Sequence, residues 1–341
     1  MSVSRSAYAS DELPKVTVVM AVRNEAKCIR HSLARVLDQD YPKERMEIIV
    51  ADGLSTDGTR EALAALQSAH KHLRVIDNPK RTVAPGLNRA IREATGDIIV
   101  RVDGHTEIAH DYVSECVGRL LTTGADNVGG NVTAVGQTRF GKAVALATSS
   151  RFGVGGARFH YAGEEQWVDT VYMGAWPRPV LDRIGLFDEE LVRDQGDELN
   201  YRLLASGGRI LLSPRIKSVY TGRSTPWSLW RQYYEYGFWK VRVMQKHPRQ
   251  MRPRQFAPGI LVASLVASVV LSTVRPFGRL LFAVISGSYI LANLGASVSV
   301  ARRYGLSHIP LLPVTYGILH FGYGLGFLAG LVRFARRWGK S

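Results

Sequence analysis

The first hundred residues alternate between two hydrophobic patterns. Four near-continuous apolar runs rich in β-branched residues predict strands, and two segments between them, with apolar residues at three- and four-residue spacing, predict amphipathic helices. The predicted strands are Lys15–Val22, Met46–Ala51, Leu73–Ile76 and Asp97–Val102, and the predicted helices cover Ile29–Leu37 and Ala62–Ala69. Strands that are apolar on both faces are typical of a mostly parallel sheet covered by helices on both sides. We therefore predict an α/β fold for this part of the chain.

The last quarter of the chain contains three long apolar stretches, Gly259–Val274, Leu280–Val300 and Ile309–Val332. The second and third have 21 and 24 residues, which at about 1.5 Å per residue is enough to cross a hydrocarbon core of about 30 Å. Residues 258–341 include eight Arg or Lys and no Asp or Glu. Because a soluble helical domain would need polar outward faces, we predict a membrane domain here.

Two membrane topologies are compatible with these stretches. The N-terminal residues Met1–Pro14 lack the apolar region of a signal peptide, so we expect the part before the stretches to be cytosolic. Three spans would then place Arg333–Lys340 outside, against the positive-inside bias. Two spans plus one interfacial or re-entrant segment would keep it inside. Pro310, Pro313 and five glycines make the third stretch irregular, and both topologies remain open.

The segment Trp227–Arg254 precedes the apolar stretches and mixes aromatic with basic residues. Between Arg231 and Arg254 it has seven basic residues and one acid, Glu235. This pattern suits a helix at the membrane surface, with rings at headgroup depth and cations on anionic lipid. Nucleic-acid binding can produce the same pattern, but the adjoining membrane domain already accounts for it. We expect a membrane and no nucleic acid as partner.

Composition narrows the class of protein further. Hydrophobic residues make up 46% of the chain and charged residues 21%, which excludes global disorder. The formal net charge is +15, with much of the excess in and just before the apolar stretches. Two cysteines, Cys28 and Cys116, cannot form a disulfide framework, and we interpret both as buried thiols in a reducing compartment.

Polar residues follow each predicted strand, where the carboxyl ends of parallel strands form ligand sites. They are Arg23-Asn24-Glu25, the loop Asp52–Thr59, Asp77–Arg81 and Asp103-Gly104-His105. No glycine-rich dinucleotide or P-loop motif follows any strand, which argues against a dehydrogenase or a P-loop NTPase. Asp57 is predicted to cap a helix, whereas a carboxylate at Asp52 could bind a nucleobase N–H or a ribose hydroxyl.

These loops, together with two later segments, resemble glycosyltransferase family 2. The motifs that carry the resemblance are VVMAVRNEA, ADGLSTDGT, NPKRTVAPGLNRAI, VRVDGHT, FDEELVRDQGDELNYRL and WRQYYEYGFWK. They span about Val16 to Pro248 in the family's order, and the chain is most similar to the membrane-bound subgroup that includes succinoglycan glucosyltransferases. The resemblance implies a GT-A fold, which is Rossmann-like, followed by C-terminal transmembrane helices.

The resemblance also assigns the donor site residue by residue. Asn24, Glu25 and Asp52 resemble positions that hold the nucleoside. Asp77, Lys80 and Arg81 match positions lining the nucleotide site.

Asp103 matches the first acid of the D-x-D motif, which binds a divalent metal, Mn²⁺ or Mg²⁺, on the diphosphate. His105 replaces the second acid, and imidazole tilts the preference toward Mn²⁺. Without a metal, the cations Lys80, Arg81 and Arg101 would have to stabilise the leaving group.

The catalytic base is the point at which this sequence departs from the family. The signature E-D-x-[DE]-L carries the base at its Asp, and alignment on Glu198-Leu199 places Gly196 at that position. Asp197 or Asp194 could act from a shifted backbone, or the base could be lost. A purely structural alternative is that Asp194 caps the helix through Leu199–Ala205 while Asp197 and Glu198 favour its first turn.

The resulting expectation is a metal-dependent, inverting, non-processive glycosyltransferase. We expect it to use a UDP-sugar, UDP-glucose foremost, and a lipid-linked acceptor in exopolysaccharide or glycolipid synthesis. Q-x-x-R-W, the motif of processive relatives, is absent. Two alternatives are a membrane-anchored sugar-nucleotide-binding pseudo-transferase and a nucleotidyltransferase.

The expected domain order follows from these assignments. Residues 1–14 are a polar tail, 15–225 a cytosolic catalytic domain, 226–257 an interfacial helix, and 258–341 a membrane domain with two or three spans. The expected location is the inner membrane, as a multi-pass protein.

Overall fold

The computed structural model describes residues 13–338, which divide into two compact units. The first comprises residues 13–133 and 161–220, and the second comprises residues 134–160 and 221–338. The sequence predicts one continuous domain over 15–225, whereas residues 134–160 group with the C-terminal helices. The first twelve residues of the predicted polar tail and the last three of the predicted membrane domain lie outside the described part.

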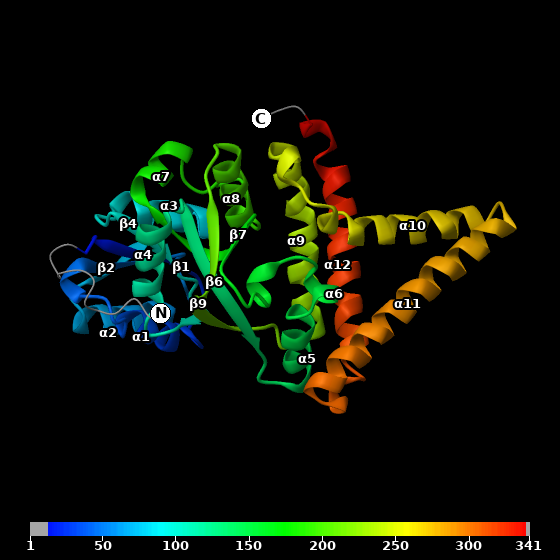
Figure 1. Cartoon of the computed structure of the whole chain (residues 1–341), viewed down its shortest axis with the longest axis horizontal. Coiled ribbons are helices and arrows are strands. Elements are labelled where there is room, and N and C mark those ends of the chain that lie inside the picture. The colour runs from blue at the N-terminus through cyan, green and yellow to red at the C-terminus, as the bar shows by residue number, and fades with distance from the viewer. Residues whose placement is uncertain (1–12, 339–341) are drawn as a thin grey trace. The chain divides into compact units, whose positions relative to one another are not determined.

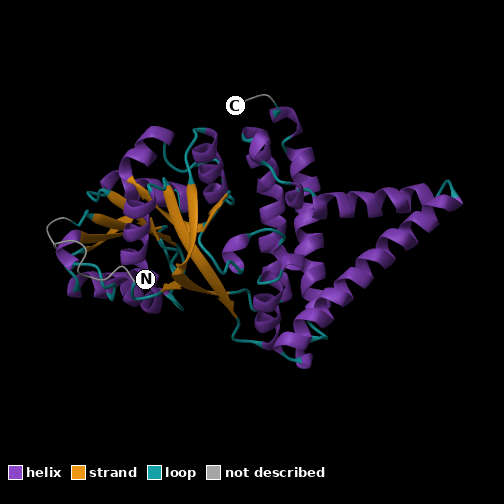
Figure 2. Cartoon of the chain, viewed as in Figure 1, coloured by secondary structure: helices purple, strands orange, loops and turns teal. Residues whose placement is uncertain are grey.

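The first unit is built on a single sheet, which Figure 2 shows in orange with helices packed against it. Its strand order, over the described residues, is β3-β2-β1-β4-β8-β6-β9-β5, with β7 paired to β9. The strands are β1 (Val16–Val22), β2 (Met46–Asp52), β3 (Leu73–Asp77), β4 (Ile98–Arg101), β5 (Thr106–Ile108), β6 (Asn127–Val135), β7 (Gln166–Val168), β8 (Tyr172–Pro177) and β9 (Ile210–Thr221).

The predicted strands and helices of the first hundred residues are confirmed to within a few residues at their ends. β1 to β4 pair in parallel, as the apolar runs predict. The sheet continues with antiparallel pairs from β8 onward, so only its N-terminal half is parallel. The helices of this unit are α1 (Ile29–Leu37), α2 (Thr59–Ala69), α3 (Val83–Glu93), α4 (Tyr112–Thr123), α7 (Arg178–Ile184) and α8 (Gln195–Ala205).

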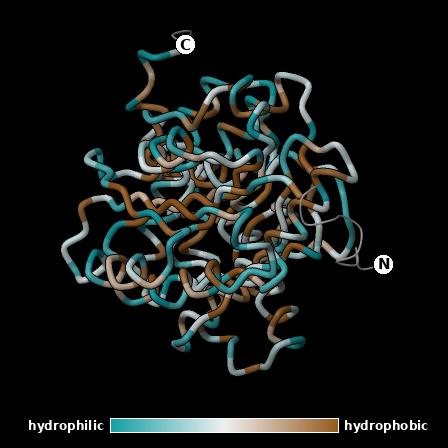
Figure 3. Tube along the Cα trace, turned by 90° about the vertical axis from the view of Figure 1, so that its left-hand side faces the viewer, coloured by the Kyte–Doolittle hydropathy of each residue, from teal (hydrophilic) through white to brown (hydrophobic). Residues whose placement is uncertain are grey.

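The core of this unit lies between the sheet and the helices beside it. Val18, Met20 and Ile48 on the strands are fully buried, as are Ile29 and Leu33 on α1. In Figure 3 hydrophobic segments are frequent in the middle of the trace, and many of the outlying turns are hydrophilic. This packing holds the strands rigidly, so the loops at their carboxyl ends start from defined positions.

The second unit is helical. Its helices are α5 (Arg139–Thr148), α6 (Arg151–Val154), α9 (Pro226–Lys246), α10 (Ala257–Ser272), α11 (Pro276–Tyr304) and α12 (Leu312–Arg333). Among the described residues, α11 and α12 are long and apolar enough to cross a membrane, and α10 is apolar but shorter. In Figure 1, α10 and α11 meet at a tip that points away from α12.

Candidate functional site

The polar loops predicted at the strand ends do meet at one edge of the sheet. In the pairing register Val22 lies opposite Asp52, and Asp52 lies opposite Asp77. Asn24 and Glu25 follow directly after β1, and Asp103 follows β4, which pairs with β1 on its other side. The sequence therefore located this edge of the first unit correctly.

Asp52 is fully buried beneath its own loop. Its carboxylate accepts hydrogen bonds from the Ser55 backbone N–H at 3.1 Å and from Ser55 Oγ at 2.5 Å. Arg60, in the first turn of α2, places Nη1 2.9 Å from Asp52 and Nη2 2.9 Å from Asp77. Sequence reasoning missed Arg60, because nothing in its local pattern distinguishes it from an ordinary surface cation of a helix.

The loop around Asp52 contains strained backbone. Leu54 has φ of +55°, a region that bulky residues rarely occupy, and Asn24, in the neighbouring loop after β1, has the same φ, which asparagine adopts more readily. Asn24 is held on both sides, since its N–H donates to Ser55 Oγ at 2.9 Å and its Oδ1 accepts from the Thr56 N–H at 3.0 Å. These bonds keep the loop in one conformation at the sheet edge.

Asp57 accepts hydrogen bonds at the start of α2, as predicted, although the N-cap residue itself is Gly58. Its Oδ1 accepts from the Thr59 N–H at 3.1 Å and from Thr59 Oγ1 at 2.5 Å, and its Oδ2 accepts from the Ala26 N–H at 3.1 Å. The Thr59 hydrogen bond is the main cause that holds the pKa of Asp57 below its usual value.

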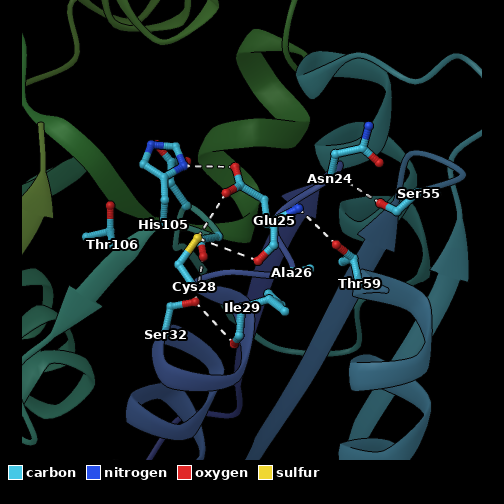
Figure 4. A network of polar contacts seen from close by, with 12 residues as sticks. Asn24, Glu25, Ala26, Cys28, Ile29, Ser32, Ser55, Thr59, His105 and Thr106 are labelled. Atoms are coloured by element: carbon cyan, nitrogen blue, oxygen red, sulfur yellow. Dashed lines mark hydrogen bonds and ion pairs between the residues drawn. The ribbon is translucent and has the colours of Figure 1, made fainter. Parts of the chain in front are cut away.

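Glu25 turns away from Asn24 and toward His105 (Figure 4). Its Oε1 lies 3.2 Å from His105 Nδ1, and its Oε2 accepts a hydrogen bond from Cys28 Sγ at 3.0 Å. Burial, reinforced by this carboxylate, raises the pKa of Cys28 to about 12. Cys28 is therefore a neutral thiol, but it is only partly buried, so the predicted burial holds for Cys116 and not for Cys28. The structure places Glu25 beside the D-x-H motif rather than in the Asp52 loop.

Asp103 is paired with a buried arginine from its own strand. Arg101 Nε and Nη2 lie 2.9 and 2.8 Å from the same carboxylate oxygen, Oδ1. Burial alone would raise the pKa of Asp103, but the charges of Arg101 and His105, with hydrogen bonds from Arg101 and Tyr172, lower it below its usual value. Asp103 is thus an ionised carboxylate at the sheet edge, able to accept a cation.

The donor set around Asp103 fits a particular kind of metal site. No group of three or more His, Cys, Asp or Glu side chains within residues 13–338 could hold a metal ion. A fully protein-bound cage therefore does not fit. One ionised carboxylate does fit Mg²⁺ or Mn²⁺, which keep several waters and take substrate phosphates as ligands.

Lys80 and Arg81 take different positions after β3. Lys80 Nζ lies 2.6 Å from Glu189 Oε2, and Asn88 Nδ2 donates to Glu189 Oε1 at 3.0 Å. Hydrogen bonds from Lys80 and Asn88 lower the pKa of Glu189 below its usual value. Arg81 is exposed, with φ of +60°. Lys80 is therefore engaged by an acid that the sequence did not single out.

The two candidate bases stand at the start of α8. Asp194 occupies the N-cap position in a left-handed conformation, φ +60°, and its side chain makes no capping hydrogen bond. The predicted side-chain cap is therefore wrong, because this backbone conformation directs the side chain away from the helix amides. Asp197 and Glu198 lie in the first turn, as predicted. Glu198 is buried and bound to Arg202, which makes it structural.

Asp197 belongs to a buried chain of hydrogen bonds. Thr170 Oγ1 donates to Asp197 Oδ1 at 2.8 Å and accepts from Asn200 Nδ2 at 2.9 Å. Asn200 Oδ1 accepts from Asn127 Nδ2 at 2.8 Å, and Asn127 Oδ1 accepts from the Ala175 N–H at 3.2 Å. This chain ties the orientation of the Asp197 carboxylate to strands β6 and β8.

Gly196 lies beside the ion pair between Arg101 and Asp103. A Cβ at residue 196 would be 3.3 Å from Arg101 Nη1, so a carboxylate there would meet the same guanidinium. Arg101 also lies over the Phe187 ring, 5.7 Å from its centroid. The start of α8 and the Asp103 carboxylate are therefore joined through one arginine, and the position aligned with the family's base faces this arginine.

Comparison with known proteins gives one consistent result. Residues 17–178 match the model of the family described as Glycosyl transferase family 2. The chain is 31% identical to the succinoglycan biosynthesis protein ExoA of Rhizobium meliloti, over 96% of this chain and 99% of the relative.

A second relative, from Methanococcus voltae, is 25% identical over 93% of this chain and 97% of its own length. It is a dolichyl N-acetyl-alpha-D-glucosaminyl phosphate 3-beta-D-2,3-diacetamido-2,3-dideoxy-beta-D-glucuronosyltransferase.

Solved structures agree at the level of the fold. The mannosyltransferase PcManGT from Pyrobaculum calidifontis, in complex with GDP-Man and Mn²⁺, superposes with a TM-score of 0.61 at 23% identity, covering 98% of this chain and 90% of that one. Staphylococcus aureus TarS 1–349, in complex with UDP-GlcNAc, gives a TM-score of 0.51 at 15% identity, covering 94% and 92%. Near-full-length similarity and the arrangement of the sheet lead to the same conclusion: the chain belongs to glycosyltransferase family 2 and has the GT-A fold.

Proposed function

We propose that the protein transfers a sugar from a UDP-sugar to a lipid-linked acceptor, with inversion and one sugar at a time. The observation that carries the proposal is the ionised Asp103, joined through Arg101 to the start of α8, where Asp197 stands. A glycosyl transfer needs charge neutralised on the leaving diphosphate and a carboxylate to accept the acceptor's proton. Family membership supports this division of roles.

Donor binding is assigned to the loop from Asp52 to Thr59 and to Asp77. Asp52 is fully buried and bonded to Ser55 and Arg60, so it acts as a positioning residue for the loop and for the guanidinium. The Asp77 side chain is 51% exposed and is the carboxylate of this group that presents itself at the surface. The nucleoside is then recognised by loop atoms, Asn24 and Asp77 together.

The diphosphate is assigned to Asp103, His105 and Arg101. A divalent ion bound there supplies positive charge to the leaving nucleoside diphosphate. Asp103 would be its main protein ligand, and His105, held in orientation by Glu25, would be the second. Arg101 keeps Asp103 ionised and adds a fixed positive charge at the same edge.

The base is assigned to Asp197. Thr170 holds its Oδ1 from one side, which leaves the carboxylate in a defined orientation at the helix start. An acceptor hydroxyl within hydrogen-bond reach would lose its proton to this carboxylate as it attacks the anomeric carbon. Asp194, one residue before α8 in a strained conformation, is the alternative base.

The lipid acceptor and the membrane location rest on relatives and on the helical unit. The two relatives are named for a succinoglycan pathway and for a dolichyl-phosphate-linked substrate. Apolar helices in the second unit would hold the enzyme at the cytosolic face of the inner membrane, with residues 226–257 at the interface. Exopolysaccharide or glycolipid synthesis is the corresponding pathway class.

A donor panel with Mn²⁺ or Mg²⁺ and membrane lipid extract tests the proposal. Asp103→Ala should lower turnover about 10³-fold or more, because several kcal/mol of charge stabilisation is lost. Asp197→Asn should lower it about 10²- to 10⁴-fold, with Asp194→Asn as the matched control. Activity that survives both Asp103→Ala and EDTA would instead assign the leaving group to Arg101, Lys80 or Arg81.

Gly196 supports one competing function, a membrane-anchored sugar-nucleotide binder without turnover. The family signature places the base at this position, where this chain has no side chain. That alternative predicts UDP binding in calorimetry, with no product from any donor and no change in Asp197→Asn. UDP release with an active donor excludes it, and release of UDP rather than pyrophosphate also excludes a nucleotidyltransferase.

A further inference from the structure

The helix α12 passes the length and hydropathy test for a membrane span, but its surroundings differ from those of α11. Within the most apolar window, 44% of α12 is buried against the protein, compared with 11% of α11. Leu312, Tyr316 and Leu319 are fully or almost fully buried. A helix that faces lipid on most sides would have most of its apolar side chains exposed at the protein surface. The elements that cover α12 therefore indicate whether it lies in the bilayer.

One face of α12 is covered by α9 at very short range. Three α12 glycines spaced four residues apart lie on this face, and a Cβ on each would stand close to an α9 backbone oxygen. These distances are 3.3 Å for Gly322 to Trp230, 2.0 Å for Gly326 to Tyr234 and 2.6 Å for Gly330 to Phe238. Farther along, Gln245 Nε2 donates to the Phe334 carbonyl at 2.8 Å. The two helices therefore run side by side and in parallel.

The charged residues of α9 make it unfavourable to insert this helix into a bilayer beside a membrane span. It carries Arg231, Glu235, Lys240, Arg242 and Lys246. A charged residue at the centre of a spanning helix costs about 2.5–3.5 kcal/mol on insertion scales. If α12 crossed the bilayer, α9 would have to enter with it along most of its length.

The helices α5 and α6 cover α12 from another direction. Ser150 Oγ lies 2.8 Å from Tyr316 Oη, and His320 Nε2 lies 2.8 Å from the Phe152 carbonyl. Arg139 and Lys142 on α5 are exposed. Polar and charged helices thus border α12 on two sides.

The α10–α11 hairpin has the opposite character. Its large exposed side chains are apolar, and they continue from the first turn of α10, across the tip, into the second half of α11. They are Ile260, Val266, Val269, Val270, Val274, Phe277, Leu280, Phe282, Val284, Ile290, Leu291 and Leu294. Arg275 and Arg279 at the tip are the charged residues of this hairpin between Ala257 and Val300.

The hairpin and α12 form a triangle. The start of α10 packs on the second half of α12, where a Cβ at Gly324 would be 2.4 Å from the Pro258 carbonyl oxygen. The second half of α11 packs on the first half of α12, where Asn293 Nδ2 donates to the Pro313 carbonyl at 3.0 Å. At about 1.5 Å per residue the sides between these contacts and the tip are about 21 Å along α10, 26 Å along α11 from the tip to Asn293, and 17 Å along α12 from Pro313 to Gly324.

These lengths set the angle between α10 and α12. Perpendicular sides of about 21 and 17 Å would need a third side of about 27 Å, close to the length of α11 between the tip and Asn293. The helices α10 and α12 therefore stand at roughly a right angle, and they cannot both cross a bilayer. If α12 crossed it, α10 would lie flat inside the hydrocarbon and carry Arg275 and Arg279 into it. If α10 crosses it, these two arginines reach the far headgroups.

We propose that the α10–α11 hairpin alone enters the lipid bilayer, and that α12 lies beside α9 along the cytosolic surface of the membrane. Both ends of the hairpin then return to the same side, and the C-terminal residues Arg333, Arg336 and Arg337 remain on the side of the catalytic unit. The glycine face of α12 serves to join it to α9 at the headgroups. This inference rests on the membrane attachment proposed above.

The test compares two exposed apolar residues, Val284 on α11, midway between the tip and Asn293, and Leu325 on α12. Each is replaced by Cys in a full-length Cys28→Ser, Cys116→Ala background and labelled with bimane. The protein is reconstituted in phosphatidylcholine–phosphatidylglycerol vesicles that contain 5-doxyl or 12-doxyl lipid. We expect stronger quenching by 12-doxyl lipid at residue 284 and stronger quenching by 5-doxyl lipid at residue 325.

Each outcome has a defined meaning. Equal, deep quenching at both residues would overturn the surface position of α12 while leaving the membrane attachment intact. No quenching at residue 284 would overturn the attachment itself. As a second measurement, Leu306→Cys and Trp338→Cys, which flank α12 and are both exposed, should react with an impermeant maleimide from the same side of sealed vesicles, whereas a spanning α12 would place them on opposite sides.

Discussion

Replacing Thr170 by Val separates the orientation of Asp197 from the stability of the fold. The substitution keeps the shape of the side chain and removes one hydroxyl, which donates to Asp197 Oδ1 at 2.8 Å and accepts from Asn200 Nδ2 at 2.9 Å. Thr170 and Asn200 are both buried. Two separate effects follow, one on each neighbour.

The effect on Asn200 is a loss of stability. Its amide donor would be left buried without this acceptor, which costs about 1–3 kcal/mol. For a unit of this size each kcal/mol lowers the melting temperature by about 2–4 °C. The effect on Asp197 is a loss of rate. A hydrogen bond to a charged group contributes about 1.5–3 kcal/mol, which corresponds to a fall in turnover of about 10- to 150-fold.

Thermal melting and initial transfer rates of the detergent-solubilised enzyme measure the two effects. Thr170→Ser restores the hydroxyl and should recover most of the rate, even if the missing methyl group lowers the melting temperature. Thr170→Val should also change the pH profile of turnover on its acidic limb, where the base titrates. A Thr170→Val enzyme that melts earlier but transfers sugar at the normal rate would refute the assignment of Asp197 as the base.

Three further outcomes follow from contacts in the first unit. Lys80→Met should lower stability by about 0.2–1 kcal/mol at pH 7. Because the Glu189 pKa is depressed below its usual 4.5, this stabilisation is present above that value, and urea melts of the two proteins should converge as the pH falls through the depressed pKa. Cys28, whose pKa is raised to about 12 by burial and a neighbouring carboxylate, should resist iodoacetamide at pH 8 in the folded protein and react after unfolding, as mass spectrometry would show. Gly130→Ala should destabilise the sheet strongly, since a Cβ would be 1.7 Å from a backbone oxygen of the adjacent strand, whereas Gly118→Ala in α4, with open space around it, should be neutral or stabilising by up to about 1 kcal/mol in the same melting assay.

The sequence by itself determined the elements and the edge of the sheet where the site lies. Strand and helix positions follow from hydrophobic periodicity, which is a local property, and β1 to β4 appear where it predicts them. The carboxyl ends of parallel strands lie together whatever the details of packing. Asp52, Asp77 and Asp103 were therefore identifiable from their places after strands, and the family from the order of its motifs.

Only the tertiary structure decided which side chains meet. Arg60 reaches two aspartates at once, Glu189 binds Lys80 from 109 residues away, and Thr170 binds Asp197 from 27 residues away. None of these partners has a pattern of its own, because each contact depends on how a loop or helix packs on the sheet.

The position that we propose for α12 relative to the membrane also depends on the tertiary structure. Its 22 residues are apolar enough to pass as a span, and composition cannot distinguish lipid from protein as the surroundings of an apolar helix. The glycine face against α9 and the perpendicular α10 make that distinction, because they are properties of neighbouring helices rather than of the segment itself.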